Sequence, residues 1–490
     1  SYSVTGVQTC ALPIWSGTTI QTKIFDPVCR YEGETVAAVA AETSLQARDA
    51  LRAIEVTYEV LPFVSDERTA LDPGGPPVHP GGNQVGKTDA YSRGDVDRGF
   101  AEADVVLEQR YRTACEIHTP LEPHGCVANW EGDRLTLWES TQGVYAVQKT
   151  VAEVLGMPLS KVRVIGRYMG GGFGSKLTPG KYTIIAALLA RAVGRPVRIF
   201  LTREETFLAV GNRPANTMTL KAGVRKDGTL TAFDFTCIGS GGAYPFGGSL
   251  VVDWLIRDLY ACPNVRTTAT DVYINAGPAR AFRAPGHPQG AWALEQMMDA
   301  LADAIRMDPV ELRFKNIPSV SQARKGNPPY GTPGFAECLR RGAEAFVGGE
   351  ARKKAAEADR TGPIRRGVGM AAGLWSSGDG RPPATILLKL YADGSVNLNM
   401  GASDIGTGTK TVMALVVAEE LGVRPDAVQI EHADTGTTQF ATPSGGSKTV
   451  PTESPAVRAA AVSVKQQLLE MAARSLKVDQ IGRASCRERV

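Results

Sequence analysis

Two distant stretches of the chain share one order of predicted structural elements. Residues 152–164 align with residues 418–430, and both contain the pattern A-E-x-L-G near the end of a segment whose apolar spacing predicts a helix. Upstream of each lies a predicted hairpin, whose turn at 131–133 or 392–394 precedes alternating residues typical of a strand. We interpret this pattern as an internal duplication; two unrelated strand–helix–strand units with similar patterning are the alternative.

Each half also carries two polar loops that contain glycine. They are residues 140–143 (S-T-Q-G) and 170–174 (G-G-G-F-G) in the first half, and 404–408 (D-I-G-T-G) and 444–447 (S-G-G-S) in the second. Glycine supplies 53 of the 490 residues, more than the roughly 7% of ordinary proteins. Because glycine lets backbone N–H groups approach anionic oxygens, we expect the four loops to converge on one extended, phosphate-bearing ligand; structural turns are the alternative.

The loop at 170–176 has the outline of a phosphate-binding turn, because it lies between a predicted strand at 161–165 and a predicted helix at 181–193. It is not a Walker A loop, since Ser175 rather than glycine precedes Lys176, and it lacks the G-x-G-x-x-G spacing of dinucleotide-binding folds. Its composition therefore indicates a phosphate-bearing cofactor without naming one.

The charge balance and the cysteines exclude several classes of protein. There are 54 Lys and Arg against 51 Asp and Glu, a net charge of +3, which does not fit a nucleic-acid binder that neutralises many phosphates. No apolar run reaches the roughly 20 residues of a membrane span. The cysteines form no C-x-x-C pair and the five histidines are scattered, so we predict free thiols, no metal held by protein ligands, and a cytoplasmic location with the periplasm as alternative.

The two ends of the chain read differently from the rest. Residues 1–14 and 480–490 contain strings that resemble translated sequencing adaptors, so we interpret them as artefacts, with natural termini as the alternative. Residues 15–64 are expected to form a strand at 34–41, a helix capped by Thr43 and a strand at 54–60.

Two breaker-rich segments divide the remaining chain. Residues 73–82 contain four prolines and four glycines, which predicts a linker over 65–95, and a charged segment rich in Pro and Gly predicts a second linker over 320–366. The first half then occupies 96–319 and the second half 367–479.

Specific motifs give these halves a family resemblance. Residues 169–176 (M-G-G-G-F-G-S-K) resemble the Gly loop of the xanthine dehydrogenase/aldehyde oxidase family, and more narrowly that of the separate molybdopterin-binding large subunit of bacterial multi-subunit members. The resemblance covers 18–479 and implies an α+β fold: a partial, hammerhead-like α/β domain at 15–64, followed by two related α+β molybdopterin-binding halves. Further matches follow in the family's order at 140–143, 201–205, 280–289, 308–313, 404–408 and 444–449.

The resemblance implies an enzyme that oxidises an aldehyde or an aromatic N-heterocycle with water as the oxygen source. Its cofactor would be molybdopterin with molybdenum, in the cytosine dinucleotide form, and electrons would pass to iron–sulfur and FAD groups on partner subunits, in a dimer of heterotrimers. A nucleotide-dependent enzyme that uses the 170–176 loop, and a non-catalytic assembly subunit, are the alternatives.

Site residues follow from the matching positions. The resemblance implies that Gln142 hydrogen-bonds the apical oxygen on molybdenum and that Arg283 contacts the substrate or its surroundings, which makes both catalytic candidates. No residue of the chain is expected to ligate the metal. The expected cofactor-binding residues are Gln142, Gly171, Gly172, Phe173, Gly174, Gly406, Thr407, Gly408, Ser444, Gly445, Gly446 and Ser447.

The chain also departs from the family pattern. Thr407 and Ser175 stand where Gln and Gly are common, and Ala284 replaces the Cys of carbon monoxide dehydrogenases, which argues against that activity. The family's catalytic Glu lies in its last third, so we expect it to fall outside this chain and the chain alone to be inactive. His118 and Glu122 match family positions to which we assign a structural role.

Overall fold

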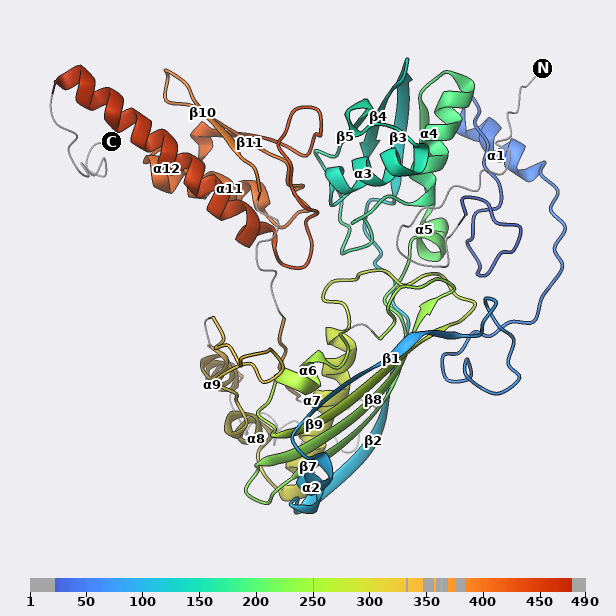
Figure 1. Ribbon diagram of the computed structural model, residues 1–490, viewed down its shortest axis with the longest axis vertical. Helices are drawn as coiled ribbons and strands as arrows, with labels where there is room; N and C mark the ends of the chain where they lie inside the picture. The colour runs from blue at the N-terminus through green and yellow to red at the C-terminus, as the bar shows by residue number, and fades with distance from the viewer. Residues whose placement is uncertain are drawn as a thin grey trace.

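The computed structural model describes residues 23–249, 251–331, 334–346, 357, 363, 369–375 and 384–477 (Figure 1). It has a mixed α+β fold in which three sheets are flanked by helices, which confirms the predicted fold class. The two terminal segments that resemble adaptors lie outside the described residues. None of the described helices combines the length and apolar character that crossing a membrane requires.

The largest sheet has five strands in the order β1-β9-β8-β7-β2, and all its neighbours are antiparallel except β8 and β9. Helix α7 packs on this sheet and supplies Met297 and Leu301 to a core that also contains Phe233 and Phe235, all fully buried. The elements of this unit are β1 (Gln84–Arg93), α2 (Val96–Ala101), β2 (Val105–Thr113), β7 (Asn216–Val224), β8 (Leu230–Gly242), α6 (Trp254–Asp258), β9 (Asn264–Tyr273), α7 (His287–Ile305), α8 (Pro309–Lys315) and α9 (Phe335–Ala345). The short helix α5 (Arg203–Ala209) lies apart from this sheet (Figure 1).

The two other sheets belong to the predicted repeats, and their topologies match. In each, a hairpin of antiparallel strands is followed by a helix and by a strand that pairs parallel with the second hairpin strand. The first repeat contains β3 (Gly125–Glu131), β4 (Arg134–Glu139), α3 (Val144–Leu155), β5 (Val162–Ile165), α4 (Lys181–Val193) and β6 (Val197–Phe200). The second contains β10 (Leu387–Leu390), β11 (Val396–Met400), α11 (Thr409–Leu421), β12 (Val428–His432) and α12 (Thr449–Leu476).

The shared A-E-x-L-G pattern has a local structural cause. Its final residues, Gly156 and Gly422, end α3 and α11 in the left-handed conformation, with φ of 64° and 70°. Glycine adopts this conformation without the steric cost that a Cβ adds, so it is the common residue just after a helix. The hairpin turns contain glycine in the same region of φ, Gly132 in one repeat and Gly394 in the other.

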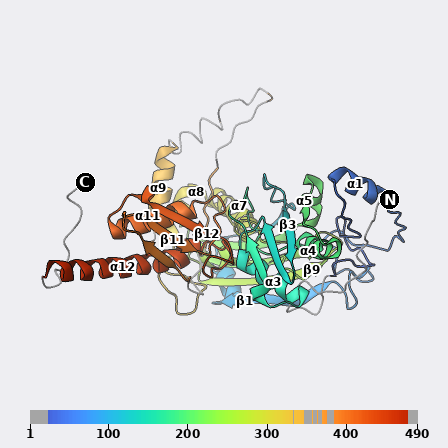
Figure 2. The same cartoon turned by 90° about the horizontal axis from the view of Figure 1, so that it is seen from above.

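The repeats contact each other where their parallel strands end. The guanidinium of Arg163 on β5 donates two hydrogen bonds, at 2.9 and 2.7 Å, to the fully buried carboxylate of Asp434 just after β12. The backbone N–H of Gly166 donates to the Ala433 carbonyl, and the N–H of Thr435 donates to the Val164 carbonyl. Each repeat thus extends the hydrogen bonding of the other, and Figure 2 shows β12 and α11 of the second repeat beside β3 and α3 of the first.

Four expectations about the elements need correction. Residues 34–41 and 54–60 are not strands, because neither segment has a strand among the described residues to share ladder hydrogen bonds. Helix α1 (Ser44–Arg52) between them forms as predicted, with a capping box at Thr43. The linker expected over 65–95 contains β1, which pairs with β9, and the linker expected over 320–366 contains α9.

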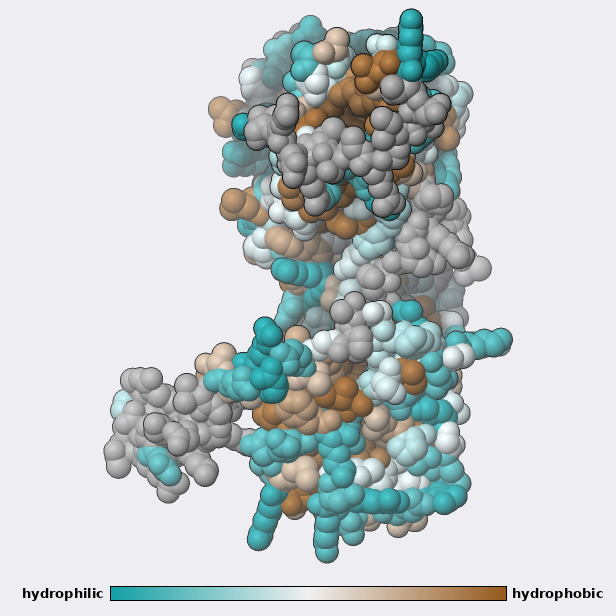
Figure 3. Space-filling model, turned by 90° about the vertical axis from the view of Figure 1, so that its left-hand side faces the viewer, coloured by the Kyte–Doolittle hydropathy of each residue, from teal (hydrophilic) through white to brown (hydrophobic). Residues whose placement is uncertain are grey.

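Helix α12 projects from the rest of the described chain (Figures 1 and 2). Its first half is buried at Val457 and Ala461, whereas apolar side chains of its second half, including Met471 and Leu476, are more than half exposed. Figure 3 shows apolar surface in the upper part of the molecule, on the face that lies at the left in Figure 1.

Candidate functional site

Gln142 connects three of the four predicted loops. Its side-chain Oε1 accepts a hydrogen bond from the Gly174 N–H at 2.8 Å, and its Nε2 donates to the Ser444 carbonyl at 2.8 Å. Its backbone N–H donates to the Lys176 carbonyl, and its own carbonyl accepts from the Ser444 N–H, both at 2.8 Å. Only 2% of Gln142 is exposed, so the residue is fixed by its contacts to both repeats.

The fourth loop joins this group through Ser444. The Ser444 hydroxyl donates to the Ser403 carbonyl at 2.6 Å, immediately before the 404–408 loop. Within that loop, the Asp404 carboxylate accepts from the backbone N–H groups of Gly406 and Lys410 at 2.9 and 3.1 Å. The four loops predicted to converge are therefore linked by direct hydrogen bonds.

The glycines of the first repeat are packed against protein atoms. A Cβ at Gly172 would lie 2.6 Å from Gln142 Oε1, and one at Gly174 would overlap the Ala281 carbonyl, where φ is also +114°. Phe173 between them has a φ of 55°, which is uncommon for a residue with a side chain, and the residue is 41% exposed. Packing inside the protein thus requires glycine at these places.

Three loop glycines of the second repeat face open space instead, whereas a Cβ on Gly445 would lie 2.8 Å from the Leu177 side chain. No atom of the described residues lies within 4 Å of a Cβ built on Gly406, Gly408 or Gly446, and all three have positive φ. Gly408 begins α11 as Gly143 begins α3, so the exposed Thr407 occupies the position that the buried Gln142 has in the first repeat. This open cradle of backbone, at the N-terminus of a helix, suits an anionic group of a ligand.

Arg283 lies beside the glycine loop of the first repeat. Its backbone N–H donates to the Phe173 carbonyl at 2.8 Å, and its side chain is exposed. The buried Arg213 holds the same segment, because its guanidinium donates to the Arg283 carbonyl at 2.8 Å and lies 4.6 Å from the Phe282 ring centre. The structure thus brings Arg283 to the loops that contain Gln142 and Phe173.

Sequence patterns did not reveal the buried titratable residues behind these loops. Burial raises the pKa of Glu139, at the end of β4, to about 8, although the Thr183 hydroxyl donates to it at 2.8 Å. Burial lowers the pKa of His124 to about 3, and this ring contacts the Ser175 hydroxyl at 3.0 Å. Because these side chains lie at ordinary core positions, hydropathy alone could not separate them from surface residues.

Several buried polar atoms around the second-repeat loops have no hydrogen-bond partner among the described residues. A buried donor or acceptor left without a partner costs free energy, and such atoms are therefore expected to meet a ligand or water. Together with the open glycine cradle they fit a large polar cofactor with phosphate groups. They are Ser403 Oγ, His432 Nδ1, Thr452 Oγ1 and Glu453 Oε2.

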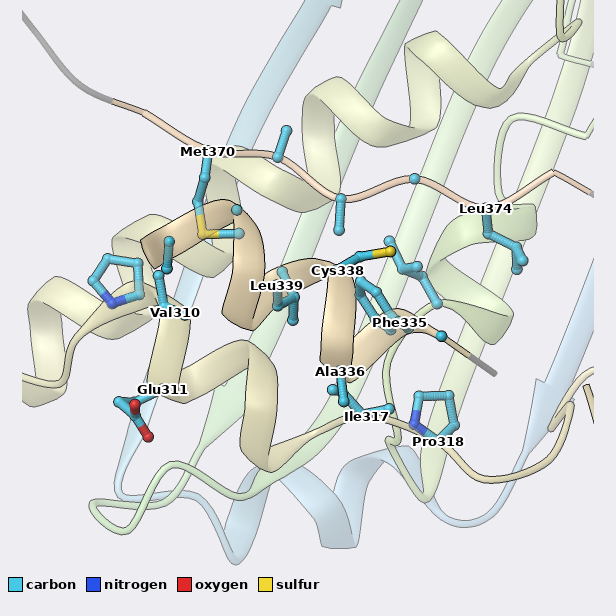
Figure 4. A pocket seen from close by; sticks show the side chains of 18 of the residues that line it. Val310, Glu311, Ile317, Pro318, Phe335, Ala336, Cys338, Leu339, Met370 and Leu374 are labelled. Carbon is cyan, nitrogen blue, oxygen red and sulfur yellow. The ribbon is translucent and has the colours of Figure 1, made fainter. Parts of the chain in front are cut away.

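A cavity of about 1120 Å³ lies elsewhere, between α8, α9 and residues 369–375. Figure 4 shows that its lining is mainly apolar, with Val310, Leu339 and Met370 among the side chains that face it. None of the predicted site residues lines this cavity.

Comparisons with known proteins agree on one family. Models of the molybdopterin cofactor-binding domain match residues 78–317 and 343–485. The xanthine dehydrogenase molybdenum-binding subunit of Escherichia coli O157:H7 is 34% identical over 462 residues, which cover 91% of this chain and 60% of that protein. The nicotinate dehydrogenase large molybdopterin subunit of Eubacterium barkeri is 35% identical over 327 residues, which cover 66% of this chain and 76% of that protein.

A solved structure shows the same relationship. The aldehyde oxidoreductase of Desulfovibrio gigas superposes with a TM-score of 0.79 at 26% identity, over 91% of this chain and 51% of that one. The chain therefore spans about 60% of the length of the first curated relative and about half of this structural one.

Proposed function

We propose a function for this chain from its membership of the molybdopterin-binding subunits of the xanthine dehydrogenase/aldehyde oxidase family. In this proposal the chain holds molybdopterin with molybdenum between its repeats and oxidises a small substrate there. The observation that carries the proposal is the position of Gln142, whose amide joins the glycine loop of the first repeat to Ser444 of the second. A side chain in this place contacts both sides of the site at once.

When bound, the cofactor supplies the redox centre at which oxygen from water is added to the substrate and from which electrons leave. Gln142 has two amide hydrogens and donates one of them to the Ser444 carbonyl, which leaves the second for an oxygen of the cofactor. A neutral amide stabilises growing negative charge without being ionised itself, so Gln142 is suited to the chemical step.

The remaining residues bind and orient. We assign the phosphate groups to the open backbone of Gly406, Thr407 and Gly408, with the N-terminus of α11 adding a favourable dipole. Residues 444–447 and 171–174 would hold the pterin from the two sides that Gln142 joins. The exposed guanidinium of Arg283 would orient a polar or anionic substrate in front of Phe173.

The finer parts of the proposal follow from the names of the relatives. The relatives are called xanthine dehydrogenase, nicotinate dehydrogenase and aldehyde oxidoreductase subunits, which supports an aldehyde or an aromatic N-heterocycle as substrate. Because two of these proteins are called molybdenum-binding subunits, we propose iron–sulfur and FAD partner subunits that take the electrons. We further propose the cytosine dinucleotide form of the cofactor.

The test is metal and pterin analysis of the full-length protein expressed with its neighbouring genes. We expect molybdenum and an oxidisable pterin in near-equal amounts. We also expect Gln142→Ala to lose about 100-fold or more in kcat, the effect of removing one preorganised donor. Gln148→Ala is the matched control, because this amide also donates to backbone carbonyls but lies away from the loops on α3.

Two results would overturn the proposal. If the purified protein contains no molybdenum or pterin but binds ATP or NAD tightly, it is a nucleotide-dependent enzyme. If it binds neither molybdopterin nor a nucleotide, it is an assembly subunit. Equal losses in Gln142→Ala and Gln148→Ala would remove Gln142 from the chemistry while leaving the cofactor in place.

A further inference from the structure

A single carboxylate oxygen lies behind both loops of the first repeat. Oε2 of Glu122 accepts a hydrogen bond from the Ser140 hydroxyl at 2.8 Å and from the Gly170 backbone N–H at 2.7 Å. Ser140 begins the loop that contains Gln142, and Gly170 begins the glycine loop. One side chain therefore fixes the starting points of both segments that form the first-repeat side of the site.

Lys176 connects the end of the glycine loop to the same carboxylate. Its Nζ donates to the Glu122 carbonyl at 2.8 Å and lies 3.3 Å from Oε2, and its side chain is fully buried. The backbone of Lys176 meets Gln142, because its carbonyl accepts from the Gln142 N–H at 2.8 Å and its N–H lies 3.4 Å from Gln142 Oε1. Lys176 thus links Glu122 to the amide of Gln142.

The charges of this pair depend on each other. Burial lowers the pKa of Lys176, and the neighbouring Glu122 opposes that shift. Burial works to raise the pKa of Glu122, but hydrogen bonds from Gly170, Ser140 and Lys176 lower it overall. A buried ammonium without its partner is costly, so the pair resists rearrangement and holds the attached backbone in one geometry.

We propose that Glu122 is a positioning residue of the cofactor site, which acts through Ser140 and Lys176 to set the direction in which Gln142 presents its amide. The inference rests on the proposed function, because it needs a cofactor in front of Gln142. A misplacement of about 1 Å in a positioned donor can cost roughly 100-fold in rate. Loss of the Glu122 charge should therefore change the chemistry as well as the stability of the fold.

The experiment compares Glu122→Gln with a matched control in the full-length holoenzyme. The control is Glu295→Gln on α7, which also removes a carboxylate that accepts three hydrogen bonds, from Tyr260, Arg313 and the Ala372 N–H, but in the five-stranded unit. The readouts are molybdenum and pterin content, thermal stability, kcat and KM per bound molybdenum, and the electron paramagnetic resonance spectrum of the partly reduced metal.

We expect both variants to lose stability, but only Glu122→Gln to change the metal spectrum and to lower kcat per molybdenum by about 10- to 100-fold with a smaller change in KM. Ser140→Ala keeps the ion pair and removes one hydrogen bond, so it should shift the spectrum in the same direction even if Glu122→Gln fails to fold. Unchanged spectra and rates per molybdenum in Glu122→Gln and Ser140→Ala would show that Glu122 has only a structural role. Wild-type protein without molybdenum would instead contradict the proposed function itself.

Discussion

The substitution Glu139→Gln should remove a large pH dependence from the stability of the first repeat. Glu139 is 4% exposed, and one of its carboxylate oxygens has no partner among the described residues. Burial raises its pKa from 4.5 to about 8, so the folded chain keeps it neutral through the range in which the unfolded chain ionises it. Glu139→Gln keeps the shape and the hydrogen bond from Thr183 but cannot ionise.

The sign and size follow from proton linkage. Between pH 4.5 and 8 the unfolded state binds fewer protons than the folded state, so wild-type stability falls as pH rises, and it levels off above the folded pKa. At about 1.4 kcal/mol per pH unit, this range corresponds to roughly 5 kcal/mol. Because buried sites relax around a new charge, the measured effect should be smaller. We expect the stability of the wild type relative to Glu139→Gln to fall by about 2–4 kcal/mol over this pH range.

Urea unfolding at pH 5, 6, 7 and 8, followed by tryptophan fluorescence, measures this slope, because Trp130 and Trp138 lie on β3 and β4 of the same sheet. At pH 5 the variant should equal the wild type or be slightly less stable, and its relative stability should increase with each pH unit. Glu153→Gln on the exposed face of α3 is the control. Parallel stability curves for Glu139→Gln and wild type would refute the reasoning, since they would mean that Glu139 ionises alike in both states.

Two further predictions concern the loops and the contact between repeats. Gly174→Ala should destabilise the chain by about 3 kcal/mol or more, because its Cβ meets the Ala281 carbonyl at positive φ, whereas Gly132→Ala at an open turn should cost about 1 kcal/mol in the same urea titration. A double-mutant cycle of Arg163→Met and Asp434→Asn should give a coupling energy of about 1–3 kcal/mol, and strictly additive losses would show that the ion pair does not join the repeats.

Local signals were sufficient for the repeated units. The hairpins, α3, α11 and their glycine ends follow from residues a few positions apart, so the sequence could predict them and their duplication. The strands expected at 34–41 and 54–60 failed because a strand needs a partner that local pattern does not reveal. Strand β1 was missed for the converse reason, since its pairing with β9 stabilises a segment that reads as a linker.

The candidate site shows the same division. The motifs predicted which loops matter, and the structure brings Gln142, Phe173, Arg283 and Ser444 together, although their roles toward a cofactor stay predictions. The way in which the loops are held was not predictable. The sequence assigned Glu122 only a structural role from its family position, and the fold shows that one of its oxygens accepts from two loops and a buried lysine.

The two repeats need glycine for different reasons, so substitutions in them should have different consequences in a cell. Where the first repeat presses Gly174 against the protein's own backbone, a substitution should prevent folding, and the cell would remove the chain as a misfolded product. Where the second repeat leaves Gly408 and Gly446 facing open space, the Cβ of a larger residue would contact none of the described residues, and its only cost would be backbone strain at positive φ. Such a variant should accumulate at normal abundance and still be unable to hold its ligand, so protein levels would report damage to one repeat and conceal damage to the other.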